Sequence, residues 1–174
     1  MEAINKFETV RRLAEAVGVE VDFEDDHARY GFFKSILEES DWRLSLLSCL
    51  LVEPNTDMAT SVALDLLERV APLERDVVVL VAPAVERDRV STRVKDLGLL
   101  EVIRSWSTGG VEDLGPAAGE VLASLMDASD WLQRRVAEES CALPPLLALA
   151  EHGRTKKVRA RAQINARSIS GSGS

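Results

Sequence analysis

Apolar residues recur at helical spacing in one segment of the chain after another. Phe7, Val10, Leu13 and Val17 form the first such stripe, and Gly18 follows it. Because side chains three and four positions apart share one face of a helix, this pattern predicts an amphipathic helix with a buried face. The same spacing predicts further helices with stripes at 30–37, 44–51, 62–70, 121–126, 131–137, 146–149 and 158–169.

Residues that cap helices stand before several of these stripes. Ser40, Ser129 and Thr155 each carry a side-chain oxygen that can accept a hydrogen bond from the first turn of a helix, as does Asn55 or Thr56 before the stripe at 62–70. Glycine after a stripe, as at Gly153, predicts the end of a helix. The fold class that follows is all-α, with about eight or nine helices.

The middle of the chain leaves an alternative open. Residues 76–82 form a β-branched run between Pro72 and Pro83, and residues 99–103 are also densely apolar. Either segment fits a short buried strand or a buried helix, and an α/β fold with strands near 76–82 and 99–103 is self-consistent. The all-helical fold is favoured because the flanking segments are strongly helical.

A chain of 174 residues is long enough for a single hydrophobic core, so we expect one domain over 1–170 and a flexible glycine–serine tail at 171–174. No run approaches the roughly 18 apolar residues of a membrane span, which predicts a cytoplasmic protein without membrane insertion. Cys49 and Cys141 are expected to be buried, reduced thiols. Sixteen arginines against five lysines indicate a bacterial origin.

The net charge of −8 is unevenly distributed. The last acidic residue is Glu151, and six basic residues follow it, so the chain is an acidic body with a basic C-terminal segment. The acidic body disfavours nucleic acid and anionic membranes, so such a partner could dock only on that segment. The candidate partner-binding residues are therefore Arg154, Lys156, Lys157, Arg161 and Arg167.

One tripeptide occurs twice. Ser40-Asp41-Trp42 returns as Ser129-Asp130-Trp131, 89 residues later, which is about twice the length of a paired-helix repeat. We expect both serines to cap helices and both tryptophans to anchor the packing of related repeat units.

The segment 129–169 resembles HEAT and armadillo repeats. Leu146 to Gly153 is similar to the end of one repeat helix and its turn, and Val158-Arg159-Ala160-Arg161-Ala162 is similar to the opening of the second helix. The resemblance implies a short α-solenoid in which Val158 and Ala162 are buried and Arg159 reaches the turn between repeats. The family often has an aspartate where this chain has Thr155-Lys156.

Residue patterns that support catalysis are missing. His27 and His152 have no zinc-binding or nucleophile–base spacing around them. The glycines at 109, 110, 115 and 119 do not form a phosphate-binding loop, and the acidic run 22–26 lacks calcium-loop spacing. We therefore expect no catalytic residue, no metal site and no cofactor.

Two functional hypotheses remain. The first is a non-enzymatic protein-interaction module or adaptor, including a bacterial immunity or inhibitor protein, because stacked helices present a free surface without catalytic groups. The alternative is a nucleic-acid-associated protein similar to HEAT-like DNA glycosylases, which would use the basic C-terminal helix together with Trp42, Trp106 and Trp131.

Overall fold

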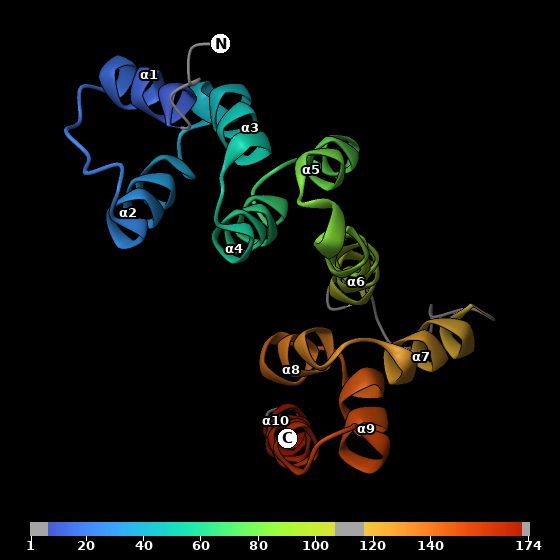
Figure 1. Cartoon of the computed structure of the whole chain (residues 1–174). Helices are drawn as coiled ribbons and strands as arrows, with labels where there is room; N and C mark the ends of the chain where they lie inside the picture. Colours follow the sequence, from blue (N-terminus) through green and yellow to red (C-terminus); the bar gives the residue numbers. More distant parts are fainter. Residues whose placement is uncertain (1–6, 107–116, 172–174) are drawn as a thin grey trace. The chain divides into compact units, whose positions relative to one another are not determined.

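The computed structural model describes residues 7–106 and 117–171, and all regular structure in these ranges is helical (Figure 1). Three 3-10 helices are present: Ser40–Trp42 (η1), Pro72–Glu74 (η2) and Ala84–Glu86 (η3). The α-helices of the described residues are α1 Glu8–Val17, α2 Asp26–Ile36, α3 Arg43–Val52, α4 Thr56–Leu67, α5 Arg75–Val81, α6 Arg87–Ser105, α7 Ala118–Asp127, α8 Asp130–Glu139, α9 Leu143–His152 and α10 Lys156–Gly171.

The all-α prediction is thereby confirmed, and the strand alternative is wrong. Residues 75–81 form α5, and residues 99–103 lie inside α6. The β-branched run folds as a helix with Val78 buried on one side, so its valines do not enter a sheet. Gly109, Gly110, Gly115 and residues 172–174 of the predicted tail lie outside the described residues.

The chain divides into two compact units, Met1–Val94 (unit 1) and Lys95–Ser174 (unit 2), and the division falls within α6. The prediction of one domain over 1–170 stays a prediction. Each unit is held together by contacts among its own residues.

Unit 1 is built from two layers of helices. α1 packs on α3 and α3 packs on α5, while α2 packs on α4 in the second layer (Figure 1). α4 joins the layers by contacts with both α3 and α5. The core between them is apolar and includes Phe33, Leu37, Leu46, Val62, Leu66 and Leu67.

Local sequence explains how the helices of unit 1 begin and end. Gly18 ends α1 with φ 78°, a backbone conformation that glycine adopts without steric cost. The Asn55 side chain accepts a hydrogen bond of 3.0 Å from the Met58 N–H and caps α4 as predicted. Ser40 does not cap a helix, because η1 intervenes and α3 begins only at Arg43.

Unit 2 is centred on α10, which packs along α9 and α8, while α7 packs on α9. Ser129 caps α8 and Thr155 caps α10, through bonds from the Leu132 and Val158 N–H groups, so both predictions are confirmed. The buried core residues of this unit are Leu100, Ile103, Leu125, Leu132, Val136, Ala137, Leu146, Leu149, Val158, Ala162 and Ala166.

The two Ser-Asp-Trp tripeptides have different structures. The first forms η1, whereas the second comprises the cap and the first two residues of α8. Trp42 and Trp131 are both half-buried, and Trp131 packs against the core of unit 2. The tripeptide therefore does not mark equivalent positions in the two units.

A different correspondence links the units. Asn55 caps α4 and Thr155 caps α10, so these two helices begin alike. The buried residues of each include the third, seventh and eleventh positions: Met58, Val62 and Leu66 in α4, and Val158, Ala162 and Ala166 in α10.

In each unit, a buried polar side chain near the start of one helix reaches a distant turn. This turn precedes α4 in unit 1 and α10 in unit 2. Arg29 on α2 bonds Glu53, and Gln133 on α8 accepts a hydrogen bond of 2.9 Å from the Arg154 N–H. Gln133 also donates to the carbonyl oxygens of Leu125 and Met126, at 3.0 and 2.9 Å. Each unit thus joins a helix start to a distant turn through one side chain.

The turn between α9 and α10 leaves no room for a side chain at Gly153. A Cβ there would lie 2.5 Å from the Leu149 carbonyl oxygen and 2.8 Å from a Val158 methyl carbon. We predict that Gly153→Ala lowers the free energy of unfolding by about 1–3 kcal/mol, because backbone and core must shift. Urea unfolding measured by circular dichroism tests this.

Gly98→Ala is the matched control, because Gly98 lies within α6 with open space around its Cα. Alanine there should stabilise the protein by about 0.4–1 kcal/mol. Equal effects of the two substitutions would contradict the packing argument.

Candidate functional site

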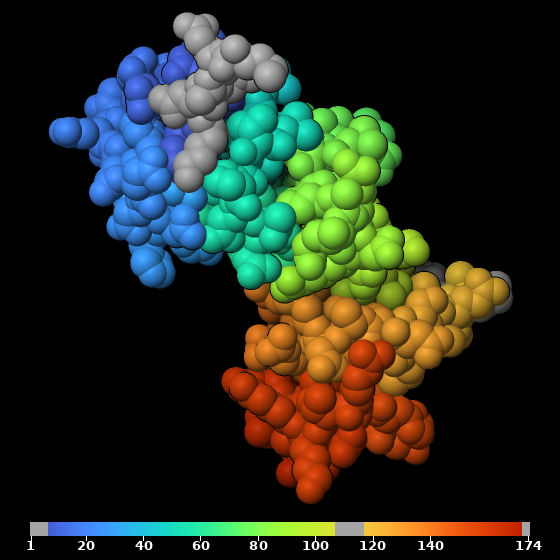
Figure 2. All heavy atoms as spheres, viewed as in Figure 1, coloured from blue at the N-terminus to red at the C-terminus, as the bar shows by residue number. Residues whose placement is uncertain are grey.

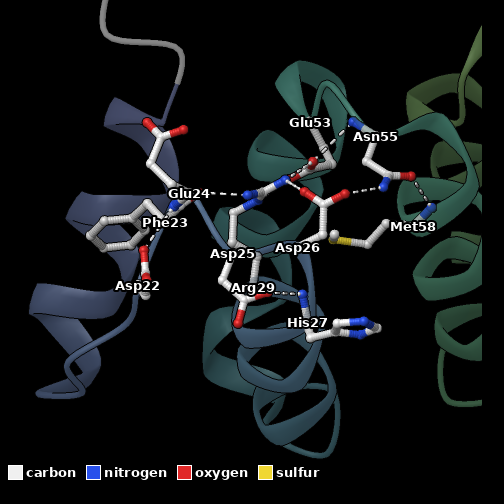
Figure 3. Close-up of polar contacts among 10 residues, drawn as sticks. All are labelled: Asp22, Phe23, Glu24, Asp25, Asp26, His27, Arg29, Glu53, Asn55 and Met58. Atoms are coloured by element: carbon white, nitrogen blue, oxygen red, sulfur yellow. Dashed lines mark hydrogen bonds and ion pairs between the residues drawn. The ribbon is translucent and has the colours of Figure 1, made fainter.

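The most elaborate polar cluster of the described residues surrounds Arg29 on α2 (Figure 3). Its side chain is 2% exposed and that of Glu53 is 0% exposed. The Arg29 Nε donates to one carboxylate oxygen of Glu53 at 3.2 Å, and Nη2 donates to the other at 3.0 Å. This bidentate geometry matches the planar guanidinium to the planar carboxylate.

The remaining donors of Arg29 reach other segments. Nη1 donates to the Phe23 carbonyl oxygen at 2.5 Å, and Nη2 donates to the Asp26 carboxylate at 2.5 Å. The guanidinium carbon lies 4.5 Å from the centre of the Phe7 ring, a cation–π contact. Arg29 therefore joins the start of α1, the loop before α2 and the end of α3.

Asn55 extends the cluster to α4. Its backbone N–H donates to Glu53 at 3.0 Å, and its side-chain nitrogen donates to Asp26 at 2.6 Å. Figure 3 shows these bonds converging from α2 and from the turn between α3 and α4. The carboxylates of Glu53 and Asp26 are thus shared between an arginine and a helix cap.

These contacts shift two pKa values. Burial opposes the charge of Arg29, but the hydrogen bonds and the charge of Glu53, together with Asp26, raise the pKa of its guanidinium. Hydrogen bonds from Asn55 and from Arg29 hold the pKa of Asp26 below its ordinary value of 3.8. Both shifts favour the charged forms, which is the pattern of a structural ion pair rather than of a proton-transfer site.

The cluster borders two shallow hollows that are open to solvent. One, of about 330 Å³, is lined by Phe7, Glu24, Asp26, Arg29, Pro54 and Asn55. The other, of about 390 Å³, is lined by Asp26, His27, Tyr30, Asn55, Asp57, Met58 and Ser61. Across residues 7–106 and 117–171, no three side chains of the His, Cys, Asp and Glu types gather in a way that could hold a metal ion. We interpret the Arg29 cluster as structural.

Among the described residues, the cysteines and histidines take part in no group that could hold a metal ion. Cys49 is buried, and burial with the nearby Glu53 charge raises the pKa of its thiol to about 12. Cys141 is exposed, so the prediction of two buried thiols is wrong for this residue, which follows the end of α8 in a turn. His27 and His152 are both exposed, and His152 lies in the last turn of α9.

The predicted basic residues gather on the last described helix and the turn before it. Lys156, Lys157, Arg161 and Arg167 are exposed on α10, and among the described residues their side chains make no hydrogen bond or ion pair. Arg154 lies in the turn, 3.4 Å from the Asp127 carbonyl oxygen and 3.8 Å from the Asp130 carboxylate. Arg159 does not join them, because it donates to the Gly153 carbonyl oxygen in its own turn.

A second surface, which the sequence did not predict, is formed by exposed apolar residues of α3, η2 and α5 in unit 1. We call it the apolar face and define it by Leu44, Leu51, Leu73, Val77 and Leu80. Their exposed fractions are 78, 61, 95, 46 and 65%. Figure 2 shows α3 (teal) and α5 (light green) side by side at the surface, in agreement with their packing.

The apolar face belongs to one layer only. On α3, Leu46, Cys49 and Leu50 point into the core, so Leu44 and Leu51 lie on the opposite side. In the other layer, no large apolar residue of α2 or α4 is exposed. Next to the face, a groove of about 230 Å³ between α1 and α3 is lined by Thr9, Arg12, Leu13, Ala16, Ser45 and Ser48.

One sequence signal could have revealed this face. The segment 43–52 is apolar on nearly all sides, which indicates a helix that is either fully covered or has a partner. The stripe predicted at 44–51 does not lie on one buried side of the helix. The structure buries Leu50 and leaves Leu44 and Leu51 exposed.

Comparison of the chain with models of protein families, with curated proteins and with solved structures found no match. Among the described helices, none combines the length and the apolar composition needed to cross a bilayer.

The Arg29–Glu53 pair generates a stability prediction. Arg29→Met should lower the free energy of unfolding by about 3–5 kcal/mol, because it leaves the Glu53 carboxylate buried and unpaired. The double variant Arg29→Met/Glu53→Met should regain much of that loss, since it removes both charges. Urea unfolding of the wild type, the single variant and the double variant tests this. A double variant with a lower free energy of unfolding than the single variant would contradict it.

The lowered pKa of Asp26 predicts how the stability of the protein changes at acidic pH. Its pKa is lowered on folding, so its contribution to stability is present above its ordinary pKa of 3.8 and is lost as pH falls through the folded value. Asp26→Asn should therefore flatten the loss of stability as the pH falls from about 5 through the folded-state pKa of Asp26. Urea midpoints across this range provide the measurement, and equal slopes in the two proteins would contradict the proposed role of Asp26.

Proposed function

We propose that the protein is a non-enzymatic protein-interaction module that binds a partner protein on the apolar face of α3 and α5. The observation that carries this proposal is the contrast between the two layers of unit 1. One layer exposes Leu44, Leu51, Val77 and Leu80, and the other exposes no large apolar residue. A neighbouring group of exposed apolar side chains is costly in water and is typical of a protein-binding surface.

Charge indicates the chemistry of the partner. Unit 1 holds 19 acidic and 11 basic residues, which equals the full net charge of −8, and unit 2 holds ten of each. Exposed Asp41, Glu74 and Asp76 lie close in sequence to the residues of the apolar face. The best-matched partner segment is an apolar helix flanked by basic residues, which the acidic unit also attracts over long range.

A helical-repeat relationship of the HEAT kind is part of this proposal. Helices two positions apart pack on each other within each unit, as α1 does on α3 and α8 on α10. Val158 and Ala162 are buried, as the resemblance implies, whereas Arg159 contacts its own turn. Stacked helices of this type bind partners on an open face without catalytic groups. A cytoplasmic bacterial immunity or inhibitor protein that covers a basic target would use such a surface.

The nucleic-acid alternative would use the basic residues of α10 together with the three tryptophans. The unit that contains α10 has equal numbers of acidic and basic residues, whereas non-specific DNA binding needs a cationic field. Trp42, Trp106 and Trp131 are half-buried, and Arg135 lies 5.8 Å from the Trp131 ring centre. We therefore favour a protein partner and use DNA as a competitor in the experiment on α10.

A charge-introducing variant tests the apolar face. Leu44→Glu/Leu80→Glu changes two exposed positions, so the fold should remain intact while two apolar contacts are replaced by carboxylates. We expect a stoichiometric partner captured from a lysate of the source cells by the wild type to be lost, a reduction of about 30-fold or more in affinity. Quantitative affinity capture provides the measurement.

The matched control is Ser35→Glu/Ser61→Glu, which adds the same charge at exposed positions of α2 and α4. It should retain the partner. Loss of the partner in the control but not in the α3/α5 variant would overturn the proposed face, as would failure of the wild type to capture any partner.

A further inference from the structure

The exposed side of α10 concentrates positive charge on a rigid support. Lys156, Lys157, Arg161 and Arg167 occupy 12 consecutive residues, a length of about 17 Å at a rise of 1.5 Å per residue. No aspartate or glutamate occurs anywhere in α10. We call these residues, with Ala160 and Ile164, the basic face.

Helical periodicity arranges the basic face in rows. At 100° per residue, Lys156 and Arg167 form one row and Lys157 and Arg161 form another. Ala160 and Ile164 lie between the two rows. Ile164 is 60% exposed, and it is the one large apolar residue exposed on this helix. The face is therefore an apolar strip with cations on both sides.

The opposite side of α10 holds the helix in place. Val158, Ala162 and Ala166 are buried against unit 2. The Asn165 side-chain nitrogen donates to the Ala137 carbonyl oxygen at 2.6 Å, which joins α10 to the end of α8. A backbone fixed in this way loses little conformational entropy when a partner binds.

The other charges of unit 2 limit the distance over which the basic face attracts a negatively charged partner. Arg154 is already near Asp127 and Asp130, and unit 2 has no net charge. A phosphate backbone has no group that would cover Ile164, and it is attracted mainly by net positive charge. A polypeptide can satisfy both features, because one helix can present a central apolar residue with carboxylates on either side.

We propose that the basic face of α10 is a docking site for an acidic amphipathic helix of a partner protein. Carboxylates of that helix pair with the two cationic rows, and its central apolar side chains pack on Ala160 and Ile164. This site differs in chemistry from the apolar face of unit 1, whose partner carries basic residues. With both surfaces, the chain is an adaptor that binds two partners of opposite charge.

The probe is a fluorescently labelled helical peptide with leucine in the central row and glutamate in the two flanking rows. Its binding to the full chain is followed by fluorescence anisotropy at low and at physiological ionic strength. We expect saturable binding that weakens with salt, a loss of about tenfold or more with Arg161→Glu/Arg167→Glu, and a smaller loss with Ile164→Ala.

Arg89→Glu/Arg134→Glu is the matched control, because it makes the same change in net charge at exposed residues outside α10. This variant should bind the peptide to within about twofold of the wild type. An equal loss in both double variants would show general charge attraction and would overturn the site.

Two competitors complete the experiment. Duplex DNA and vesicles containing phosphatidylserine should displace the peptide less effectively than unlabelled peptide does. Stronger displacement by either, or no peptide binding at low salt, would overturn the proposal. Leu44→Glu/Leu80→Glu should leave peptide binding unchanged, so failure of the apolar face and failure of the basic face are distinguishable.

Discussion

The buried ion pair between Arg29 and Glu53 is the interaction on which unit 1 depends. It places two full charges where water does not reach, and such charges are tolerated only when each keeps its partner and its hydrogen bonds. Because the partners lie at the start of α2 and the end of α3, the pair sets the register of these two helices. Asn55 bonds Glu53 and also caps α4, so the alignment of α2 and α3 extends to α4. The same pair holds the end of α3, the helix whose outer side carries the exposed Leu44 and Leu51.

In unit 2, a neutral side chain rather than an ion pair joins the start of a helix to a distant turn. Gln133 is fully buried and uses both ends of its amide, donating to two carbonyl oxygens at the end of α7 and accepting from the Arg154 N–H. A neutral amide costs less to bury than an ion pair. Gln133 also bonds the turn from which α10 begins. The position of the basic face therefore depends on this contact, as the position of the apolar face depends on the contacts of Arg29.

Much of the fold could be predicted from the sequence, and less of the candidate sites. Helical spacing and the caps at Asn55, Ser129 and Thr155 were sufficient for the helices outside the middle of the chain, because these signals are local. The segments that form α5 and α6 remained open between helix and strand, because periodicity does not distinguish a short buried strand from a buried helix. Ser40 failed as a cap because a 3-10 turn precedes α3. The burial of Arg29 was not predicted, since its partner lies 24 residues away and only tertiary contact brings them together. The apolar face was missed because a helix that is apolar all round does not reveal which side is covered.

The two units differ in charge and in surface: unit 1 is acidic with an exposed apolar layer, and unit 2 is neutral with one cationic helix. Hydrogen–deuterium exchange of the chain with and without its captured partner tests the central claim most directly. We predict slower exchange in α3 and α5, with no change in α2 and α4. Protection confined to α2 and α4, or no protection anywhere in unit 1, would contradict a partner-binding role for the apolar face.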